Sequence, residues 1–151
     1  MSVSIVPQPY VFFFKWLDPL TALYGVYLNF AAPQMAVQSM APNSIYDPNQ
    51  VFLFHQSGGL ALAIAILTAA IPRYSSDLSV WRILQFALLL SDFAGLSGIY
   101  HALERQGRLH PSTWTSDDQG CGGTYVVLTI VRLLFVLGVG FKTRSTTKKN
   151  A

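Results

Sequence analysis

The chain has 151 residues, of which 52% are hydrophobic and only 11% are charged. Soluble domains average about 25% charged residues, so this composition favours a lipid environment. The formal charge is +3, but the basic residues do not form a stripe with interleaved aromatic residues, which argues against a nucleic-acid partner. The single cysteine, Cys121, excludes an internal disulfide framework and argues against a thiolate metal site. It lies among glycines, and we interpret it as a small loop residue.

Four apolar segments organise the chain, at about residues 10–30, 51–71, 80–101 and 124–141. Each is close to the ~20 residues that a helix needs to cross about 30 Å of hydrocarbon. Trp and Tyr residues near the ends of the segments are typical of membrane interfaces. Buried soluble helices are the rival interpretation, but they would leave little polar chain to coat a soluble surface. We therefore predict an all-α protein with a single integral membrane domain, a four-helix transmembrane bundle in the lipid bilayer with a basic tail at 142–151.

The Lys and Arg residues outside the spans predict the orientation of the bundle. Four spans place both termini and the second connection on one side of the membrane. That side carries Arg73, Arg82, Lys142, Arg144, Lys148 and Lys149, and the other side carries only Arg105 and Arg108. The positive-inside rule then puts both termini in the cytosol. The chain ends Lys148-Lys149-Asn150-Ala151, which has the form of a dilysine retrieval signal and predicts the endoplasmic reticulum; a chance basic tail is the alternative.

Three ionisable residues lie near the middle of three different spans, namely Asp18, Asp92 and Arg132. A charge at the bilayer centre costs several kcal/mol on insertion scales, so each of these residues needs a partner or a function. Counting at ~1.5 Å per residue puts all three within roughly one helical turn of the same depth. We therefore expect them to meet as an Asp–Arg–Asp cluster. Lys15, three residues before Asp18, is an alternative partner for that carboxylate along one helix face.

The expected cluster has a structural and a catalytic interpretation. A buried Asp–Arg pair can simply hold two helices in register, at some cost in stability. Two carboxylates beside one arginine can also divide the work of acid and base, with one ionised and the other protonated. On the second interpretation Asp18, Asp92 and Arg132 are catalytic, and no cofactor is required.

Other polar residues are candidates for contacts with a substrate. Tyr24 follows Asp18 in the first span, His55 lies near the start of the second, and His101 ends the third. Histidines at membrane interfaces are usually just solvated, but these two would line a mouth on the lumenal side if both faced inwards. Two histidines without a third ligand make a poor metal site, so we predict no metal.

Several short blocks of the sequence, spread between Pro9 and Phe141, show a likeness to a known family. They are Pro9-Tyr10-Val11-Phe12-Phe13, Leu17-Asp18-Pro19, Ala22-Leu23-Tyr24-Gly25, Asp77-Leu78-Ser79-Val80-Trp81-Arg82, Leu90-Ser91-Asp92-Phe93 and Arg132-Leu133-Leu134-Phe135-Val136-Leu137-Gly138. In these blocks the chain resembles small four-span fungal membrane proteins, some of which are encoded among genes for polyketide or terpenoid secondary metabolites. Among those it is similar to the membrane-bound hydrolases that open polyepoxides in polyene α-pyrone pathways such as citreoviridin and aurovertin. No short motif defines that activity, so the resemblance transfers no site residue.

The resemblance implies an epoxide hydrolase or epoxide-opening cyclase that acts on a lipophilic polyketide or terpenoid intermediate. The soluble limonene-type epoxide hydrolases, which have an unrelated fold, also use an Asp–Arg–Asp arrangement. Here Asp92 would be the base and Asp18 the acid, or the reverse, with Arg132 between them. The alternative is a non-catalytic scaffold or a lipid- or intermediate-binding protein of the pathway. A second copy of the chain or other pathway enzymes are the candidate protein partners.

Overall fold

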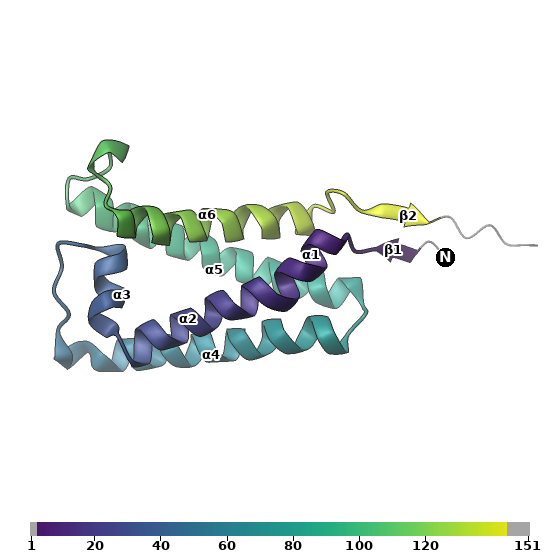
Figure 1. Ribbon diagram of the computed structural model, residues 1–151, viewed down its shortest axis with the longest axis horizontal. Helices are drawn as coiled ribbons and strands as arrows, with labels where there is room; N and C mark the ends of the chain where they lie inside the picture. Colours follow the sequence, from purple (N-terminus) through teal and green to yellow (C-terminus); the bar gives the residue numbers. More distant parts are fainter. Residues whose placement is uncertain (1–2, 145–151) are drawn as a thin grey trace, which may run out of the picture.

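The computed structural model describes residues 3–144, which are mainly helical (Figure 1). The helical elements are α1 (Gln8–Phe12), a π-helical turn (Phe13–Leu17), α2 (Asp18–Phe30), α3 (Pro33–Met40), α4 (Val51–Tyr74), α5 (Leu78–Arg105) and α6 (Ser116–Val136). Short 3-10 turns at Pro48–Gln50 and Pro111–Thr113 precede α4 and α6. The strands β1 (Val3–Ile5) and β2 (Lys142–Arg144) form an antiparallel ribbon that holds the two ends of the described chain together. The predicted all-α class is confirmed.

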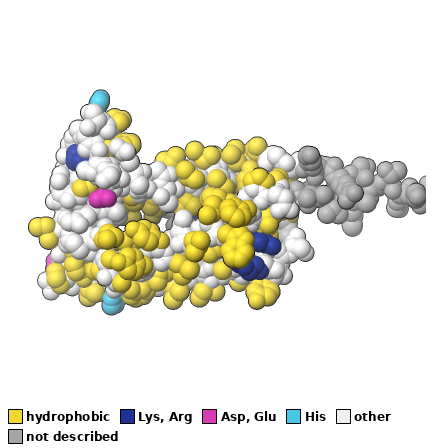
Figure 2. All heavy atoms as spheres, in the orientation of Figure 1, with side chains coloured by type: hydrophobic (Ala, Val, Ile, Leu, Met, Phe, Trp, Pro, Cys, Tyr) yellow, Lys and Arg dark blue, Asp and Glu magenta, His cyan; other side chains and the backbone are white. Residues whose placement is uncertain are grey.

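Three of the helices are long and apolar enough to cross a membrane. They are Pro48–Tyr74 (with the preceding 3-10 turn), Leu78–Arg105 and Ser116–Val136. Large hydrophobic side chains such as Leu60, Ile83 and Val127 are exposed on their outer faces. Figure 2 shows hydrophobic side chains over much of one face of the molecule. Apolar surface of this extent is typical of contact with lipid, and these features are those of a multi-pass membrane protein.

The first helical segment is continuous from residue 8 to residue 30 but contains one wider turn. In an α-helix the carbonyl of Lys15 would accept a hydrogen bond from the N–H of residue 19, and Pro19 has none. The π turn lies just before this proline, and in it the N–H of Asp18 donates to the carbonyl of Phe13. The Lys15 carbonyl accepts instead from the guanidinium of Arg73 in α4, at 2.6 Å. Pro19 therefore creates a link between the first helical segment and α4.

The bundle consists of two helix pairs, α2 with α4 and α5 with α6 (Figure 1). Each pair has a glycine that admits an aromatic ring from its partner helix. A Cβ atom added at Gly58 of α4 would lie 2.7 Å from the ring of Phe30, and one added at Gly95 of α5 would lie 2.3 Å from the ring of Tyr125. Small residues are the usual means of close helix approach in membranes, because lipid offers no hydrophobic driving force between helices.

Aromatic side chains join the two pairs at the end where the ribbon lies. Phe14, Trp81 and Phe135 form a buried core, with the rings of Phe14 and Phe135 edge to face at 4.8 Å between centroids. Phe14 comes four residues before Asp18, and Phe135 comes three residues after Arg132. The aromatic core therefore lies about one helical turn from the charged residues and supports them from one side.

The fourth apolar segment differs from its prediction at both ends. The helix α6 begins at Ser116, because Thr115 and Asp118 form a capping box in which each side chain accepts from the backbone of the other. Cys121 and its neighbouring glycines are therefore helical, and their prediction as a loop is wrong. The helix ends at Val136, before Gly138, which has a positive φ of 76° and cannot continue a right-handed helix at that angle. The segment predicted to span as far as residue 141 thus leaves the helix earlier.

The first connection, between α2 and α4, contains a short helix of its own. It contains α3, which starts with Pro33 in its first turn, the position where proline's missing N–H costs nothing. This short helix packs against α6 and α2. Pro33 therefore ends no helix here but begins one.

Candidate functional site

Arg132 lies between two carboxylates that come from different helices. Its Nη2 donates to Oδ1 of Asp18 in α2, and its Nη1 donates to Oδ1 of Asp92 in α5. The three side chains are only 1–5% exposed. A guanidinium group offers five N–H donors in a rigid fork, so one arginine can serve two carboxylates at once. We call these three residues the charged cluster. It is buried, and it joins α6 to its own partner helix α5 and to α2 of the other pair.

The structure decides between the two partners expected for Asp18. Its carboxylate is bonded to Arg132, and within residues 3–144 no ion pair joins it to Lys15. The Lys15 side chain instead lines a pocket at the ribbon end of the bundle. The alternative of an intrahelical Lys15–Asp18 pair is therefore wrong.

Each carboxylate of the charged cluster keeps one oxygen that Arg132 does not use. These atoms, Oδ2 of Asp18 and Oδ2 of Asp92, are buried and have no hydrogen-bond partner in the described part of the chain, and the same holds for Nε of Arg132. A buried polar atom left without a partner costs about 1–3 kcal/mol, so a bound water or a substrate group at these oxygens would be favourable. The charged cluster therefore presents two acid/base oxygens and one further N–H donor.

Two polar residues beside the charged cluster, the buried Gln85 and the half-buried Tyr125, were missed by the sequence reasoning. Gln85 of α5 is 1% exposed, and its amide lies beside the Asp18 carboxyl group. Tyr125 of α6 lies near Asp92, and its ring packs on Gly95. A signal for both was present, because Gln85 precedes Asp92 by seven residues and Tyr125 precedes Arg132 by seven. That spacing is about two helical turns and puts the members of each pair on one helix face.

The three residues predicted to bind substrate have other neighbours in the structure. The hydroxyl of Tyr24 lies 4.0 Å from Sδ of Met35, and the side chain is exposed. The ring of His55, also exposed, lies 5.3 Å from the ring of Phe30. Nδ1 of His101 lies 3.2 Å from Oε2 of Glu104 on the surface of α5. A role for these side chains in binding substrate stays a prediction.

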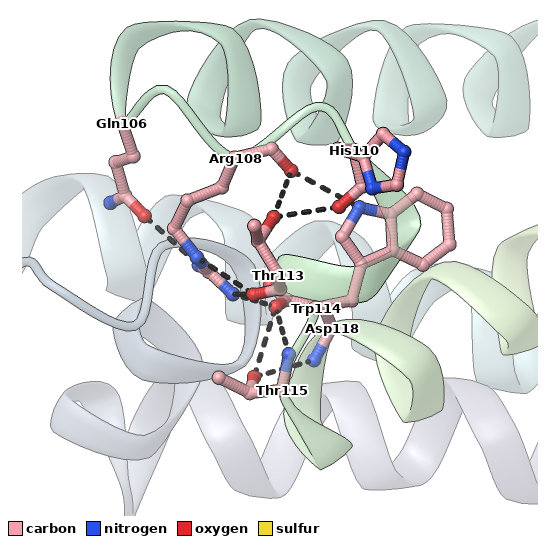
Figure 3. A network of polar contacts seen from close by, with 7 residues as sticks. All are labelled: Gln106, Arg108, His110, Thr113, Trp114, Thr115 and Asp118. Atoms are coloured by element: carbon pink, nitrogen blue, oxygen red, sulfur yellow. Dashed lines mark hydrogen bonds and ion pairs between the residues drawn. The ribbon is translucent and has the colours of Figure 1, made fainter.

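A polar network closes the connection between α5 and α6 at the end opposite the ribbon (Figure 3). The guanidinium of Arg108 donates to the carboxylate of Asp118, to the carbonyl of Thr113 and to the side chain of Gln106. The indole of Trp114 donates to the carbonyl of Arg108. Because these bonds join residues of the connection to one another and to the first turn of α6, the network fixes the loop and the start of that helix.

A groove on the surface between α5 and α6 has a volume of about 550 Å³. It is lined by Leu96, Ile99, Tyr100, Leu103, Leu109, Trp114, Gln119, Gly122, Gly123 and Val126. A Cβ atom added at Gly122 or Gly123 would meet no atom within 4 Å, so these glycines hollow the groove rather than admit a packed neighbour. Leu96 lies four residues from Asp92, and the groove therefore begins about one helical turn from the charged cluster.

We also searched the described residues for side chains that could bind a metal ion together. Within residues 3–144, no group of three or more His, Cys, Asp or Glu side chains is arranged to hold a metal ion.

The apolar helices and the charged cluster define a small helical multi-pass membrane protein with ionisable groups in its core. The chain belongs to the family described as a domain of unknown function, DUF7704, whose sequence profile matches residues 3–142. That range includes all three residues of the charged cluster. No curated protein and no solved structure matches the chain significantly. The family description names no activity, so the geometry and chemistry of the charged cluster are the basis for a functional proposal.

Proposed function

We propose that the protein is a membrane-embedded acid/base enzyme that opens epoxides of lipophilic substrates at Asp18, Asp92 and Arg132. One observation carries the proposal: a buried arginine bridges two carboxylates, and each carboxylate has a second buried oxygen that Arg132 does not contact. The sequence resemblance supports a polyketide or terpenoid intermediate of fungal secondary metabolism as the substrate.

The proposal includes the first helical segment as a fourth span. A continuous helix over residues 8–30 is about 34 Å long at 1.5 Å per residue, which is enough to cross the hydrocarbon. The pairing of β1 with β2 puts both ends of the described chain at one end of the bundle, where Arg73 and Arg82 also lie. The positive-inside rule would place that end in the cytosol. The dilysine sequence, Lys148-Lys149, lies outside the described residues; on a cytosolic tail it would direct retrieval to the endoplasmic reticulum.

The proposed hydrolysis uses the two carboxyl groups in opposite protonation states. Ionised Asp92 removes a proton from water while the water oxygen bonds to an epoxide carbon. The carbon–oxygen bond of the ring breaks, and protonated Asp18 gives its proton to the epoxide oxygen. The product is a vicinal diol, and transfer of one proton from Asp92 to Asp18 restores the enzyme. The two roles can also be exchanged, and Arg132 holds whichever carboxylate is ionised.

The same groups would catalyse a cyclisation if an internal hydroxyl group replaced water as the nucleophile. The hydroxyl oxygen would then bond to the epoxide carbon, and its proton would go to the basic carboxylate. A positioned acid or base contributes roughly 10²–10⁴ to the rate of a proton transfer. Hydrolysis adds one water to the substrate, whereas cyclisation leaves its mass unchanged, so the product distinguishes the two.

We propose that the substrate enters sideways from the bilayer. The cluster side chains are at most 5% exposed, so binding requires a local separation of α5 and α6 or of the two helix pairs. The groove between α5 and α6 ends at Leu96, one turn from Asp92, and its apolar lining fits a hydrocarbon chain. An elongated substrate could lie in this groove with its epoxide towards the charged cluster.

A non-catalytic scaffold is the second candidate, and the burial of the charged cluster is the observation that favours it. An arginine shared by two carboxylates can hold helices in register without doing chemistry. In that case the protein would bind a pathway intermediate or pathway enzymes through its apolar surface, and the charged cluster would serve only the fold.

The deciding experiment compares the wild type with Asp92→Asn in microsomes that are supplied with polyepoxide and epoxy-terpenoid substrates. This change leaves one carboxylate for Arg132, so the core stays neutral and folding should be retained. Asp47→Asn is the matched control, because Asp47 caps a 3-10 turn outside the bundle core. We expect turnover by the wild type and by Asp47→Asn, and a loss of about 100-fold or more in Asp92→Asn at equal protein level. No turnover by the wild type across the panel, together with poor accumulation of Asp92→Asn, would favour the scaffold instead.

A further inference from the structure

A pocket at the ribbon end of the bundle contains two cationic side chains and is separate from the charged cluster. It lies between the first helical segment, the end of α4 and the start of α5, and has a volume of about 410 Å³. Lys15, Arg73, Ser75 and Ser76 supply its polar groups, and Trp81 is part of its apolar wall. We call it the basic pocket.

The guanidinium of Arg73 is held in place by the backbone around it. Its Nη1 donates to the carbonyl of Ala69 at 2.5 Å, and its Nη2 donates to the carbonyl of Lys15 at 2.6 Å. The second bond exists because Pro19 cannot supply the usual helical donor to that carbonyl. The guanidinium also lies 4.9 Å from the centre of the Trp16 ring, a cation–π contact. Arg73 is therefore ordered beside Lys15 without the help of an acid.

Among the described residues, no carboxylate balances the positive charge of the basic pocket. In the part of the chain that the structure describes, neither Lys15 nor Arg73 forms an ion pair with a carboxylate. Asp77, the acid nearest to Arg73 along the chain, caps α5 by accepting from the N–H of Ser79. Two cations in one concave site produce a positive potential that attracts an anion.

The position of the basic pocket relative to the bilayer indicates which anion it binds. It lies at the ends of two candidate spans, where α4 stops at Tyr74 and α5 starts at Leu78. Trp16 and Tyr74 are exposed there, as aromatic residues commonly are at the level of the lipid headgroups. Figure 2 shows Lys and Arg side chains gathered beside hydrophobic ones towards this end of the molecule. Lipid phosphates lie at this level of a bilayer, and basic pockets between spans are a known means of binding them.

An exposed apolar stripe continues from the basic pocket towards the bilayer centre. Leu20, Leu23 and Tyr27 follow Trp16 at helical spacing on the first segment, and all of them are exposed. If a lipid phosphate bound in the basic pocket, the acyl chains of that lipid could lie along this stripe. We propose that the basic pocket binds the phosphate of an anionic glycerophospholipid, with Lys15 and Arg73 as its cationic contacts and Ser76 as a hydroxyl donor.

The test measures lipid retention by native mass spectrometry of the full chain, purified in detergent and supplied with equal amounts of phosphatidic acid and phosphatidylcholine with the same acyl chains. We expect the wild type to retain phosphatidic acid in preference. Lys15→Gln should weaken that binding about fivefold, and the double variant Lys15→Gln/Arg73→Gln about 25-fold, from the usual contribution of one cation near anionic lipid. Lys15→Arg keeps the charge and should bind like the wild type. Arg105→Gln removes the same charge at the opposite end of the bundle and should have no effect.

A second arm distinguishes a lipid from free phosphate. Inorganic phosphate at millimolar concentration is added as a competitor; retention of phosphatidic acid supports the proposal, and replacement of the lipid by free phosphate overturns it. Equal retention of phosphatidic acid by the wild type and the charge-reversed Lys15→Glu would also overturn it. The side chain of Lys15 is not part of the packed core, so if the Arg73 variant fails to fold, the Lys15 variants decide alone. The outcome is independent of epoxide opening, since no residue of the charged cluster is changed.

Discussion

The Arg132→Met substitution would remove the cation that contacts both Asp18 and Asp92 and leave an uncharged, unbranched side chain of similar volume. Two carboxylates would then be buried side by side without a counter-charge. Removing one partner of a buried ion pair typically costs 3–5 kcal/mol. Here two carboxylates lose their partner at once, and both are at most 5% exposed, so we expect a loss near the upper end, about 5 kcal/mol of unfolding free energy.

A triple variant, Asp18→Asn/Asp92→Asn/Arg132→Met, should recover most of that loss. It keeps the size of each side chain and leaves no charge in the core. Replacing a whole buried ion-pair network by neutral groups is often close to neutral in stability, whereas removing one member is not. We therefore expect the triple variant to lie within about 2 kcal/mol of the wild type. The unfolding free energy is measured by titration with dodecyl sulfate in mixed micelles, followed by circular dichroism.

The reasoning would be refuted by either of two results. One is a loss below about 1 kcal/mol for Arg132→Met, which is the range of an exposed pair rather than a buried one. The other is a triple variant as unstable as the single one, which would mean that the shape of Arg132 matters and its charge does not. If the triple variant folds, its turnover separates catalysis from structure, because an acid/base enzyme without its carboxyl groups should be inactive.

Two further predictions concern packing. Gly95→Ala should lower the unfolding free energy by about 1–3 kcal/mol, because the new methyl group would clash with the ring of Tyr125. Gly98→Ala is the control, because the space around this residue of the same helix is open, and it should not destabilise the fold. Equal losses of unfolding free energy in the two variants would contradict the contact between Gly95 and Tyr125. Phe135→Ala should cost about 3 kcal/mol through the cavity it leaves in the aromatic core, and Leu137→Ala, at a 69% exposed position, should cost far less when both are measured by thermal unfolding in detergent.

The encounter of Asp18, Asp92 and Arg132 could be foreseen because each of them is too costly to leave alone in a bilayer. Depth along a span follows directly from residue count, so three charges at one depth indicate a common cluster. The seven-residue spacings put Gln85 on the helix face of Asp92 and Tyr125 on that of Arg132, but residue count alone could not show that they lie beside the charged cluster. Their approach to the charged cluster depends on packing at Gly95 and on the rotation of α5 and α6.

Some boundaries of the helices could likewise be predicted from the sequence, and others depend on specific contacts. Apolar length alone located the second and third helices to within a few residues. The start of α6 at Ser116 depends on the reciprocal cap of Thr115 and Asp118, which overrides the glycines that follow. The π turn before Asp18 depends on Pro19 together with a donor from α4, the distant Arg73.

Composition, hydropathy and the positions of the charges determined by themselves that this is a helical membrane protein and that its core contains ionisable groups. These are properties of each segment taken separately, and the cost of exposing a polar group to lipid makes them decisive. Only the tertiary structure decided which face each helix turns towards its neighbours: it places Tyr24, His55 and His101 on the surface and gives Asp18 a partner from α6 instead of Lys15. The physical reason is that the rotation of a helix about its axis is set by its contacts with other segments. Here these contacts are aromatic rings packed on glycines and a hydrogen bond to a carbonyl that proline leaves without its helical donor. No single segment contains that information.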